Sequence, residues 1–225
     1  MNHLRKLTKN NMNPVPLFLI IVTLPLLIGG CGEKADGVNA EEVEDRDEIA
    51  YLKGSDTPYT GKVYWLYPNG QKEYEIDFWN GKEDGIDIGW YENGNKKEEG
   101  KWMNGERDGI WTKWHENGQK KMQAYFKDGK GDGLQTRWYE NGQKKNEANI
   151  KDGKLDGLWS EWYENGQKKG ETNYKDGKGD GLALEWHENG QKKAEATLKD
   201  NEGISIKLWN SKGEEVDSLE EAEAE

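Results

Sequence analysis

The sequence predicts an all-β protein in which tandem 24-residue β-hairpin repeats form one elongated antiparallel sheet. The first observation is a repeated turn signal, with Asn-Gly pairs at 69–70, 93–94, 117–118, 141–142, 165–166 and 189–190. The second is an Asp-Gly pair with the same period, at 84–85, 108–109, 132–133, 156–157 and 180–181. Self-similarity at a fixed period of roughly 20–50 residues is the signature of a repeat array, in which each unit stacks on its neighbours.

The third observation is an alternation of period two on the strands that flank each Asn-Gly pair. Before the pair at 117–118, Ile110 and Trp114 share the face that we expect to be half-buried, whereas Lys113 and His115 share the other face. The position of Ile110 is repeated by Leu134, Leu158 and Leu182. Because Asn and Gly tolerate positive φ, each Asn-Gly pair is expected to close a hairpin through a type I′ turn, and the Asp-Gly stretch to cross to the next hairpin.

The N-terminal segment precedes the fold and resembles a bacterial lipoprotein signal peptide. Residues 1–30 begin with a basic stretch, continue with an apolar run over 16–28, and end in Leu-Ile-Gly-Gly before Cys31, which is the only cysteine. The resemblance implies that Cys31 becomes the mature N-terminus and carries acyl chains such as palmitate, which anchor the protein to a membrane. A plain secretory signal with an incidental cysteine is the alternative. Gly32 after the cysteine favours the outer membrane if the source is Gram-negative.

Charge separates the remainder of the mature chain into three parts. Residues 31–50 hold eight acidic and two basic residues and are expected to form a solvated acidic tether, and residues 211–225 form a similar acidic tail in which a short helix is allowed. The repeat domain, residues 51–210, lies between them. Residues 49–210 hold 26 basic and 29 acidic residues and are therefore nearly neutral. This balance argues against nucleic-acid binding, which needs a basic stripe.

The repeat resembles the MORN-repeat variant of bacterial secreted and surface proteins. The resemblance rests on Trp-Tyr-Glu-Asn-Gly-Gln-Lys-Lys followed by Tyr-Lys-Asp-Gly-Lys and the next Asp-Gly, and residues 159–186 are its clearest copy. It implies tandem hairpins in an elongated sheet. It also implies two kinds of role, because bacterial proteins with this repeat are often labelled antitoxin-like and eukaryotic ones resemble membrane-associated scaffolds. The first and last repeats depart from the consensus, as terminal repeats of arrays usually do.

No pattern for catalysis, a cofactor or a metal stands out. His115 and His187 occupy a slot that Tyr fills in other repeats, which favours a structural aromatic over a general base. The stretches 128–133 and 176–181 are similar to calcium-binding loops, but a Lys occupies the middle ligand position and no Glu completes the loop. We therefore expect no enzyme activity, no cofactor and no metal site.

One aromatic residue per repeat forms a ladder on the face opposite the Trp row, and this aromatic ladder is the candidate binding site. Its members are Tyr67, Tyr91, His115, Tyr139, Tyr163 and His187. Such rings can bind a partner or stack on sugars, or they can simply cover the second face of the sheet. The main hypothesis is a lipid-anchored, non-enzymatic interaction module of the bacterial cell envelope with a protein partner. Glycan or cell-wall binding through the ladder is the first alternative, and an antitoxin-like role is the second.

Overall fold

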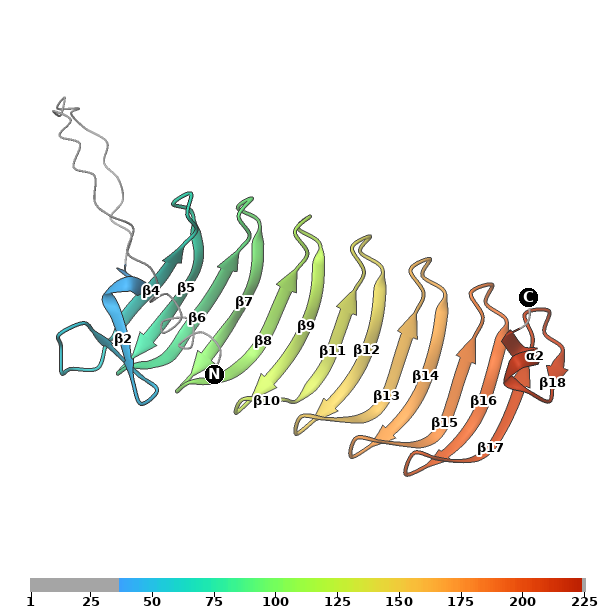
Figure 1. Cartoon of the computed structure of the whole chain (residues 1–225). Helices are drawn as coiled ribbons and strands as arrows, with labels where there is room; N and C mark the ends of the chain where they lie inside the picture. The colour runs from blue at the N-terminus through green and yellow to red at the C-terminus, as the bar shows by residue number, and fades with distance from the viewer. Residues whose placement is uncertain (1–36, 224–225) are drawn as a thin grey trace.

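The computed structural model describes residues 37–223 and shows a single-layer, 16-stranded sheet whose strands follow one another in chain order (Figure 1). Neighbouring strands are antiparallel, except that β1 pairs parallel to β4. The strands are β1 (Val38–Asn39), β4 (Gly61–Leu66), β5 (Lys72–Trp79), β6 (Lys82–Trp90), β7 (Lys96–Met103), β8 (Glu106–Trp114), β9 (Lys120–Lys127), β10 (Lys130–Gly131), β11 (Gly133–Trp138), β12 (Lys144–Lys151), β13 (Lys154–Trp162), β14 (Lys168–Lys175), β15 (Lys178–Trp186), β16 (Lys192–Lys199), β17 (Glu202–Trp209) and β18 (Glu215–Val216). The predicted all-β hairpin array is confirmed.

The Asn-Gly turns close one edge of the sheet, drawn at the top of Figure 1, but they are not type I′ turns. Gly142 has φ 85°, whereas Asn141 is not among the residues with positive φ. The amide of Gly142 donates to the carbonyl of Tyr139 at 3.0 Å, and that of Tyr139 donates to Gln143 at 2.9 Å. This is a three-residue loop in which a β-turn is followed by a left-handed Gly and a bulge. Our type I′ assignment was therefore wrong at this edge.

Two-residue turns with positive φ at both positions close the opposite edge. At Asp128-Gly129 the φ values are 48° and 73°, and the flanking residues Lys127 and Lys130 pair with each other. The same geometry occurs at Asn80-Gly81, Asn104-Gly105, Asp152-Gly153, Asp176-Gly177 and Asp200-Asn201. These are the turns with type I′ geometry. The crossing between hairpins is thus itself a hairpin turn.

Four of the five periodic Asp-Gly pairs lie inside strands and mark bulges near this second edge, and the fifth, Asp132-Gly133, lies where β10 ends and β11 begins. Between β12 and β13, Ala148 pairs with Trp159 but Ile150 pairs with Leu155, so the pairing jumps across Asp156-Gly157. Gly157 has φ 107°, a backbone conformation that favours glycine. Bulges bend and twist a strand, and in Figure 1 the strands curve as they approach this edge.

The pairing register defines two faces of the sheet. The capped face carries Val63, Ile76, Trp111 and Ala124, and the open face carries the Thr112 position with its equivalents Thr136 and Ser160. Trp111 is buried on the capped face. Ile110, in contrast, is 61% exposed on the open face. Our expectation that Ile110 and its equivalents are half-buried was therefore wrong, because the core forms on the other face.

Residues 38–60 form a structured cap on the first repeats, so the prediction of a solvated tether over residues 31–50 was wrong from residue 38 onward. The cap contains β1, the 3₁₀ helix η1 (Ala40–Glu42) and a hairpin of β2 (Val43–Arg46) and β3 (Ile49–Leu52). Its three buried apolar residues, Ala40, Val43 and Ala50, join a core with Val63, Ile76, Phe78, Trp102 and Trp111. Few but well-placed apolar residues are sufficient here, because the sheet already presents an apolar surface to them.

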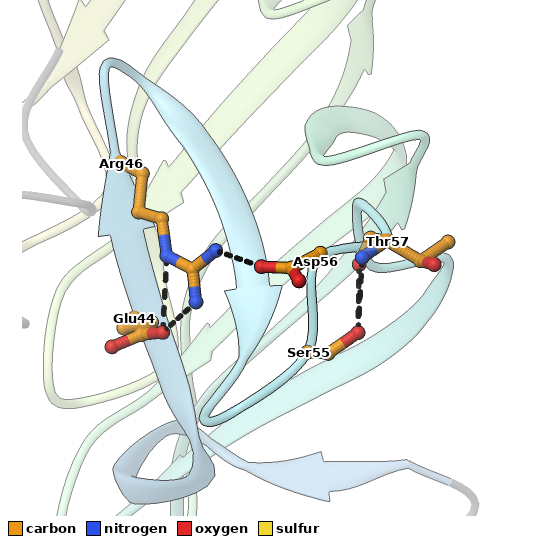
Figure 2. A network of polar contacts seen from close by, with 5 residues as sticks. All are labelled: Glu44, Arg46, Ser55, Asp56 and Thr57. Atoms are coloured by element: carbon orange, nitrogen blue, oxygen red, sulfur yellow. Dashed lines mark hydrogen bonds and ion pairs between the residues drawn. The ribbon is translucent and has the colours of Figure 1, made fainter.

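Backbone hydrogen bonds fix this cap to Asn80-Gly81, the first of the two-residue turns. The amide of Ala50 donates to the carbonyl of Gly81 at 2.8 Å, and the amide of Gly81 donates to Tyr59 at 2.7 Å. Figure 2 shows a polar network that links the cap hairpin to the following loop, in which the Arg46 guanidinium contacts Glu44 and, at 3.3 Å, Asp56. This network is solvent-exposed and contributes little stability compared with the buried residues.

The acidic C-terminal segment ends the array with β18 and the short helix α2 (Leu219–Glu223). Ala222 of α2 is fully buried, and Lys193 pairs with Glu223 at 3.2 Å. The short helix that the sequence allowed is thus present and contacts the sheet end. Neither helical segment between residues 37 and 223 has the length and apolar content of a membrane-spanning helix.

Two buried carboxyl groups beneath the cap predict a pH-dependent stability. Burial raises the pKa of Glu83 to about 7 and that of Asp87 to about 6. Acids with raised pKa values stabilise the fold most below their ordinary pKa, and this contribution disappears as pH rises through the folded-state values. We expect the free energy of unfolding to fall by roughly 1–3 kcal/mol between about pH 4 and 7, since one pKa unit corresponds to about 1.4 kcal/mol. Urea unfolding across this range measures it.

The matched variant is Glu83→Gln, which removes one of the two titrating groups. It should weaken the pH dependence and leave the stability at low pH nearly unchanged. An unfolding free energy that rises with pH in the parent protein would contradict the prediction.

Candidate functional site

The aromatic ladder lies on the capped face, at the edge of the sheet where the Asn-Gly turns lie, which we call the upper edge. Each member donates a hydrogen bond to the next repeat. The hydroxyl of Tyr139 donates to the backbone carbonyl of Trp162 at 2.8 Å, and that of Tyr163 donates to Trp186 at 2.7 Å. Tyr67 and Tyr91 make the same bond to Trp90 and Trp114 at 2.7 Å. Every side chain of the ladder is half-buried. The polar atoms of these rings therefore hold consecutive repeats together.

Histidine performs the same role as tyrosine in two repeats. Nε2 of His115 lies 3.0 Å from the carbonyl of Trp138, and Nε2 of His187 lies 2.9 Å from that of Trp209. A carbonyl only accepts, so Nε2 carries the proton in both rings. Burial, followed by nearby acidic residues, raises the pKa of Tyr67 and Tyr91, so these hydroxyls stay protonated donors at neutral pH. The Tyr/His alternation follows from this need for a donor.

The Asn of each Asn-Gly turn at the upper edge makes a second contact between repeats. Oδ1 of Asn141 accepts from the amide of Gln143 at 2.9 Å, which orders its own turn. Its Nδ2 donates to the carbonyl of Glu164 in the next turn, also at 2.9 Å. Equivalent bonds to the next turn start at Asn93, Asn117, Asn165 and Asn189. The Asn-Gly signal thus marks a contact between repeats as well as a turn.

Lysine side chains cover part of the ladder. Lys145 lies over the ring of Tyr139 at 5.4 Å, and Lys169 lies over that of Tyr163 at 5.9 Å. Lys97 approaches both Tyr74 and Tyr91. With their hydroxyls bonded and their faces partly covered, the ladder rings do not form a continuous row of free stacking platforms. The structure supports the interpretation in which they cover this face of the sheet.

One cleft interrupts this pattern, between His115 and Tyr139. It has a volume of about 340 Å³ and is lined by His115, Lys121, Arg137, Trp138, Tyr139, Glu140, Lys145 and Glu164. Within residues 37–223, Lys121, Arg137 and Lys145 form no ion pair with a carboxylate. The neighbouring repeats differ, because Lys113 pairs with Glu98 at 2.8 Å and Lys169 pairs with Glu161 at 3.3 Å. The cleft therefore combines aromatic rings with three cations that form no ion pair, beside the carboxylates of Glu140 and Glu164.

The open face carries a row of exposed aliphatic residues, which we name the apolar stripe. Its members, 42–61% exposed, are Ile86, Ile110, Leu134, Leu158 and Leu182. They lie at the bulges, and at Ile86, Leu158 and Leu182 a polar side chain of the neighbouring strand bonds to their backbone. Asn149 Nδ2, for example, donates to the carbonyl of Leu158 at 3.4 Å. Exposed apolar patches of this kind mark interaction surfaces.

The sequence analysis missed this stripe as a surface, although its signal is present. Each member directly follows an Asp-Gly pair, and we assigned these pairs to the crossing between hairpins. The alternation grouped Ile110 with Thr112 on one face, as the structure does, but we expected that face to be the half-buried one. The basic residues of the cleft, Lys121, Arg137 and Lys145, carried no comparable signal, because whether each forms an ion pair depends on which neighbours are acidic.

The described residues bring no metal-ligating group together, and the two histidines of the ladder lie apart. Between residues 37 and 223 no group of three or more His, Cys, Asp or Glu side chains is placed to hold a metal ion. His115 and His187 bond to backbone carbonyls and lie in separate repeats. Cys31, the predicted lipidation site, lies outside the described residues, as does the predicted signal peptide 1–30.

Comparison with known families finds a match over most of the sheet. The sequence profile described as the MORN repeat variant matches residues 59–80, 107–128, 131–152, 155–176 and 179–200. Each match spans an Asn-Gly turn and the strand that follows it. No curated protein matches the chain. Repeats of this kind form binding modules and are generally non-enzymatic.

The ladder geometry predicts that single hydroxyl groups stabilise the array. Tyr139→Phe removes the bond to the Trp162 carbonyl and should lower the free energy of unfolding by about 0.5–1.5 kcal/mol. Tyr139→His should retain most of it, since His115 makes the same bond. Urea unfolding of the three proteins measures these differences. Tyr125→Phe is the control, because Tyr125 is exposed on the open face, and equal losses in the two Phe variants would contradict this role of the ladder.

Proposed function

Because the chain belongs to the MORN repeat variant family, we propose that it is a non-enzymatic interaction module that binds a protein partner at the bacterial cell envelope. The proposed anchor is lipid on Cys31, with the outer membrane favoured in a Gram-negative source. The observation that supports partner binding is the apolar stripe, which leaves five aliphatic side chains exposed on the open face. The partner would present apolar side chains that match a spacing of about 10 Å per repeat.

The composition of the open face supports a protein partner rather than a lipid surface. Beside the stripe runs a row of ion pairs within single strands, including Lys144–Glu147 at 2.7 Å and Lys192–Glu195 at 2.6 Å. These pairs neutralise one another, so the face lacks the net positive charge that attracts anionic lipid headgroups. Alternating apolar and neutralised polar rows are instead typical of a protein interface with an apolar centre and a polar rim.

Glycan or cell-wall binding is the second candidate function, and the cleft between His115 and Tyr139 favours it. Aromatic rings beside three cations that form no ion pair suit a sugar that carries a carboxylate, since Arg and Lys donate charge-assisted hydrogen bonds to such groups. The candidate site is thereby narrower than the whole ladder. Its ligand-contacting groups would be Lys121, Arg137 and Lys145, with Tyr139 as support.

An antitoxin-like role in the cytosol is the third candidate, and the fate of Cys31 separates it from the other two. We expect cells that express the chain to incorporate labelled palmitate, and Cys31→Ser to abolish the label and release the protein from membranes. Membrane fractionation with fatty-acid labelling measures both. An unlabelled, cytosolic parent protein would contradict lipid anchoring through Cys31 and favour the antitoxin-like hypothesis.

Partner binding is tested by cross-linking from the apolar stripe in cells. A photo-reactive amino acid at Leu134 or Leu158 should yield a discrete cross-linked protein, whereas the same group at Gln143 in an upper turn should not. The double variant Leu134→Ser/Leu158→Ser should keep the fold, since both residues are exposed. It should weaken partner capture at least roughly tenfold, because losing even one apolar contact at an interface costs about 1.5–3 kcal/mol. Equal cross-linking from Gln143 would count against the stripe.

Co-sedimentation with purified cell-wall sacculi tests the second candidate. The parent chain should sediment with sacculi, and Lys121→Ala/Arg137→Ala should lose most of this retention. Lys169→Ala is the matched control, because Lys169 is the equivalent of Lys121 and Lys145 but is already paired with Glu161. Retention that survives the double substitution, or is lost equally in the control, would remove the cleft as the glycan site.

A further inference from the structure

The two ends of the sheet differ in how they are covered. At the N-terminal end β1 pairs with Val63 and Tyr64 of β4 alone, and the cap packs over this end of the capped face. At the C-terminal end β17 pairs with β16 along its length, but β18 pairs only with Leu208 and Trp209. Among residues 37–223, no strand pairs with the outer side of 202–207. Strand pairing covers two residues at each end, so the ends differ in the cap that packs at β4 and in the exposed stretch 202–207 of β17.

The open stretch, 202–207, has the properties of a strand that can accept another strand. All six residues are exposed, and Ile204 and Ile206 are 67% and 61% exposed. Unpaired amide and carbonyl groups along an edge are a template for strand addition, which proteins usually block with prolines, inward-pointing charges or covering segments. Here the charged residues Glu202 and Lys207 stand only at the ends of the stretch, and its middle holds no proline and no covering strand but one bulge, at Ile204.

We propose that this stretch pairs antiparallel with the same stretch of a second copy of the chain. The capped N-terminal end argues against head-to-tail addition. In that arrangement the C-terminal outer strand of one copy would pair with the N-terminal outer strand of the next. Two identical open edges can instead pair about a two-fold axis, which closes the assembly at a dimer. The product would be one continuous sheet with two outward-facing caps.

The position of β18 fixes the centre of the pairing. Because β18 occupies the outer side of Leu208 and Trp209, the second strand must end before Leu208. The axis then lies in the middle of the open stretch, near Ile204 and Ser205. Two aliphatic side chains from each copy would meet there, and cross-strand apolar pairs of this kind stabilise strand pairing.

The first test is the association state of a chain that starts at residue 32. Every described strand and buried residue lies after residue 36, so this chain keeps the described fold and lacks Cys31. Sedimentation across a dilution series should show a reversible dimer. Ile204→Lys should raise its dissociation constant at least roughly tenfold, whereas Ile110→Lys, equally exposed but on the open face, should not change it. Circular dichroism confirms that both variants are folded.

The second test fixes the register. In separate chains, Ile204→Cys and Ser205→Cys place a single cysteine near the axis, and at least one should form a disulfide-linked dimer under mild oxidation. Ser211→Cys, beyond the open stretch, should stay unlinked, because paired cysteines need Cα atoms within about 7 Å.

Three outcomes would overturn the proposal. They are a monomer at all concentrations, growth beyond a dimer, and a dimer lost through Ile110→Lys but not through Ile204→Lys. The last result would place the contact on the apolar stripe, so failure of the edge contact remains distinguishable from failure of partner binding through the stripe.

Discussion

The hydrogen bond from each ladder side chain to a carbonyl of the next repeat is the interaction on which this structure depends. A single-layer sheet has no second layer to bury, and over most of its length only small residues such as Ala124 and Ala148 are buried. Stability must then come from contacts between neighbours. Tyr139 supplies one such contact at the upper edge, and Gly153, whose amide donates to Gly131 at 2.8 Å, supplies another at the lower edge. The Asn-Gly turns keep a period of 24, and the last repeat, one residue shorter, retains both contacts, from His187 to Trp209 and from Asn201 to Gly179.

The first and last strands of the sheet are covered in different ways. At the first repeats the cap buries Val63, Ile76 and Trp111 and builds the one substantial apolar core among the described residues. This core also encloses Asp87, whose carboxylate accepts from the indole of Trp102 at 2.9 Å. At the last repeat, β18 and α2 cover only part of β17. Cooperativity should therefore be strongest near the cap and weakest near β17, since an array propagates order from its most stable unit.

Periodicity made the hairpin array predictable, because Asn-Gly and Asp-Gly recur at fixed positions that only turns or bulges explain. It could not assign the turn type, since an Asn followed by Gly fits both a type I′ turn and a β-turn with a Gly bulge. The cap was missed for a different reason. Its composition is acidic, and its apolar residues Val43 and Ala50 become buried only because the sheet supplies their contacts. The ladder residues were identified correctly as a repeated feature, but their bonding partners are 22–23 residues away and invisible to a local pattern.

The distribution of roles over the sheet decides where function can reside. Residues that repeat most faithfully, such as Tyr139 and Asn141, are bonded to the neighbouring repeat. Specificity must instead come from positions at which the repeats differ or at which side chains stay exposed. Arg137 illustrates the first case, because the equivalent position in the next repeat is Glu161, which neutralises its lysine. Leu158 illustrates the second, since its backbone is fixed by Asn149 while its side chain remains exposed. A repeat array can thus keep its fold constant and vary its surface, because the bonds that hold the repeats leave these positions unconstrained.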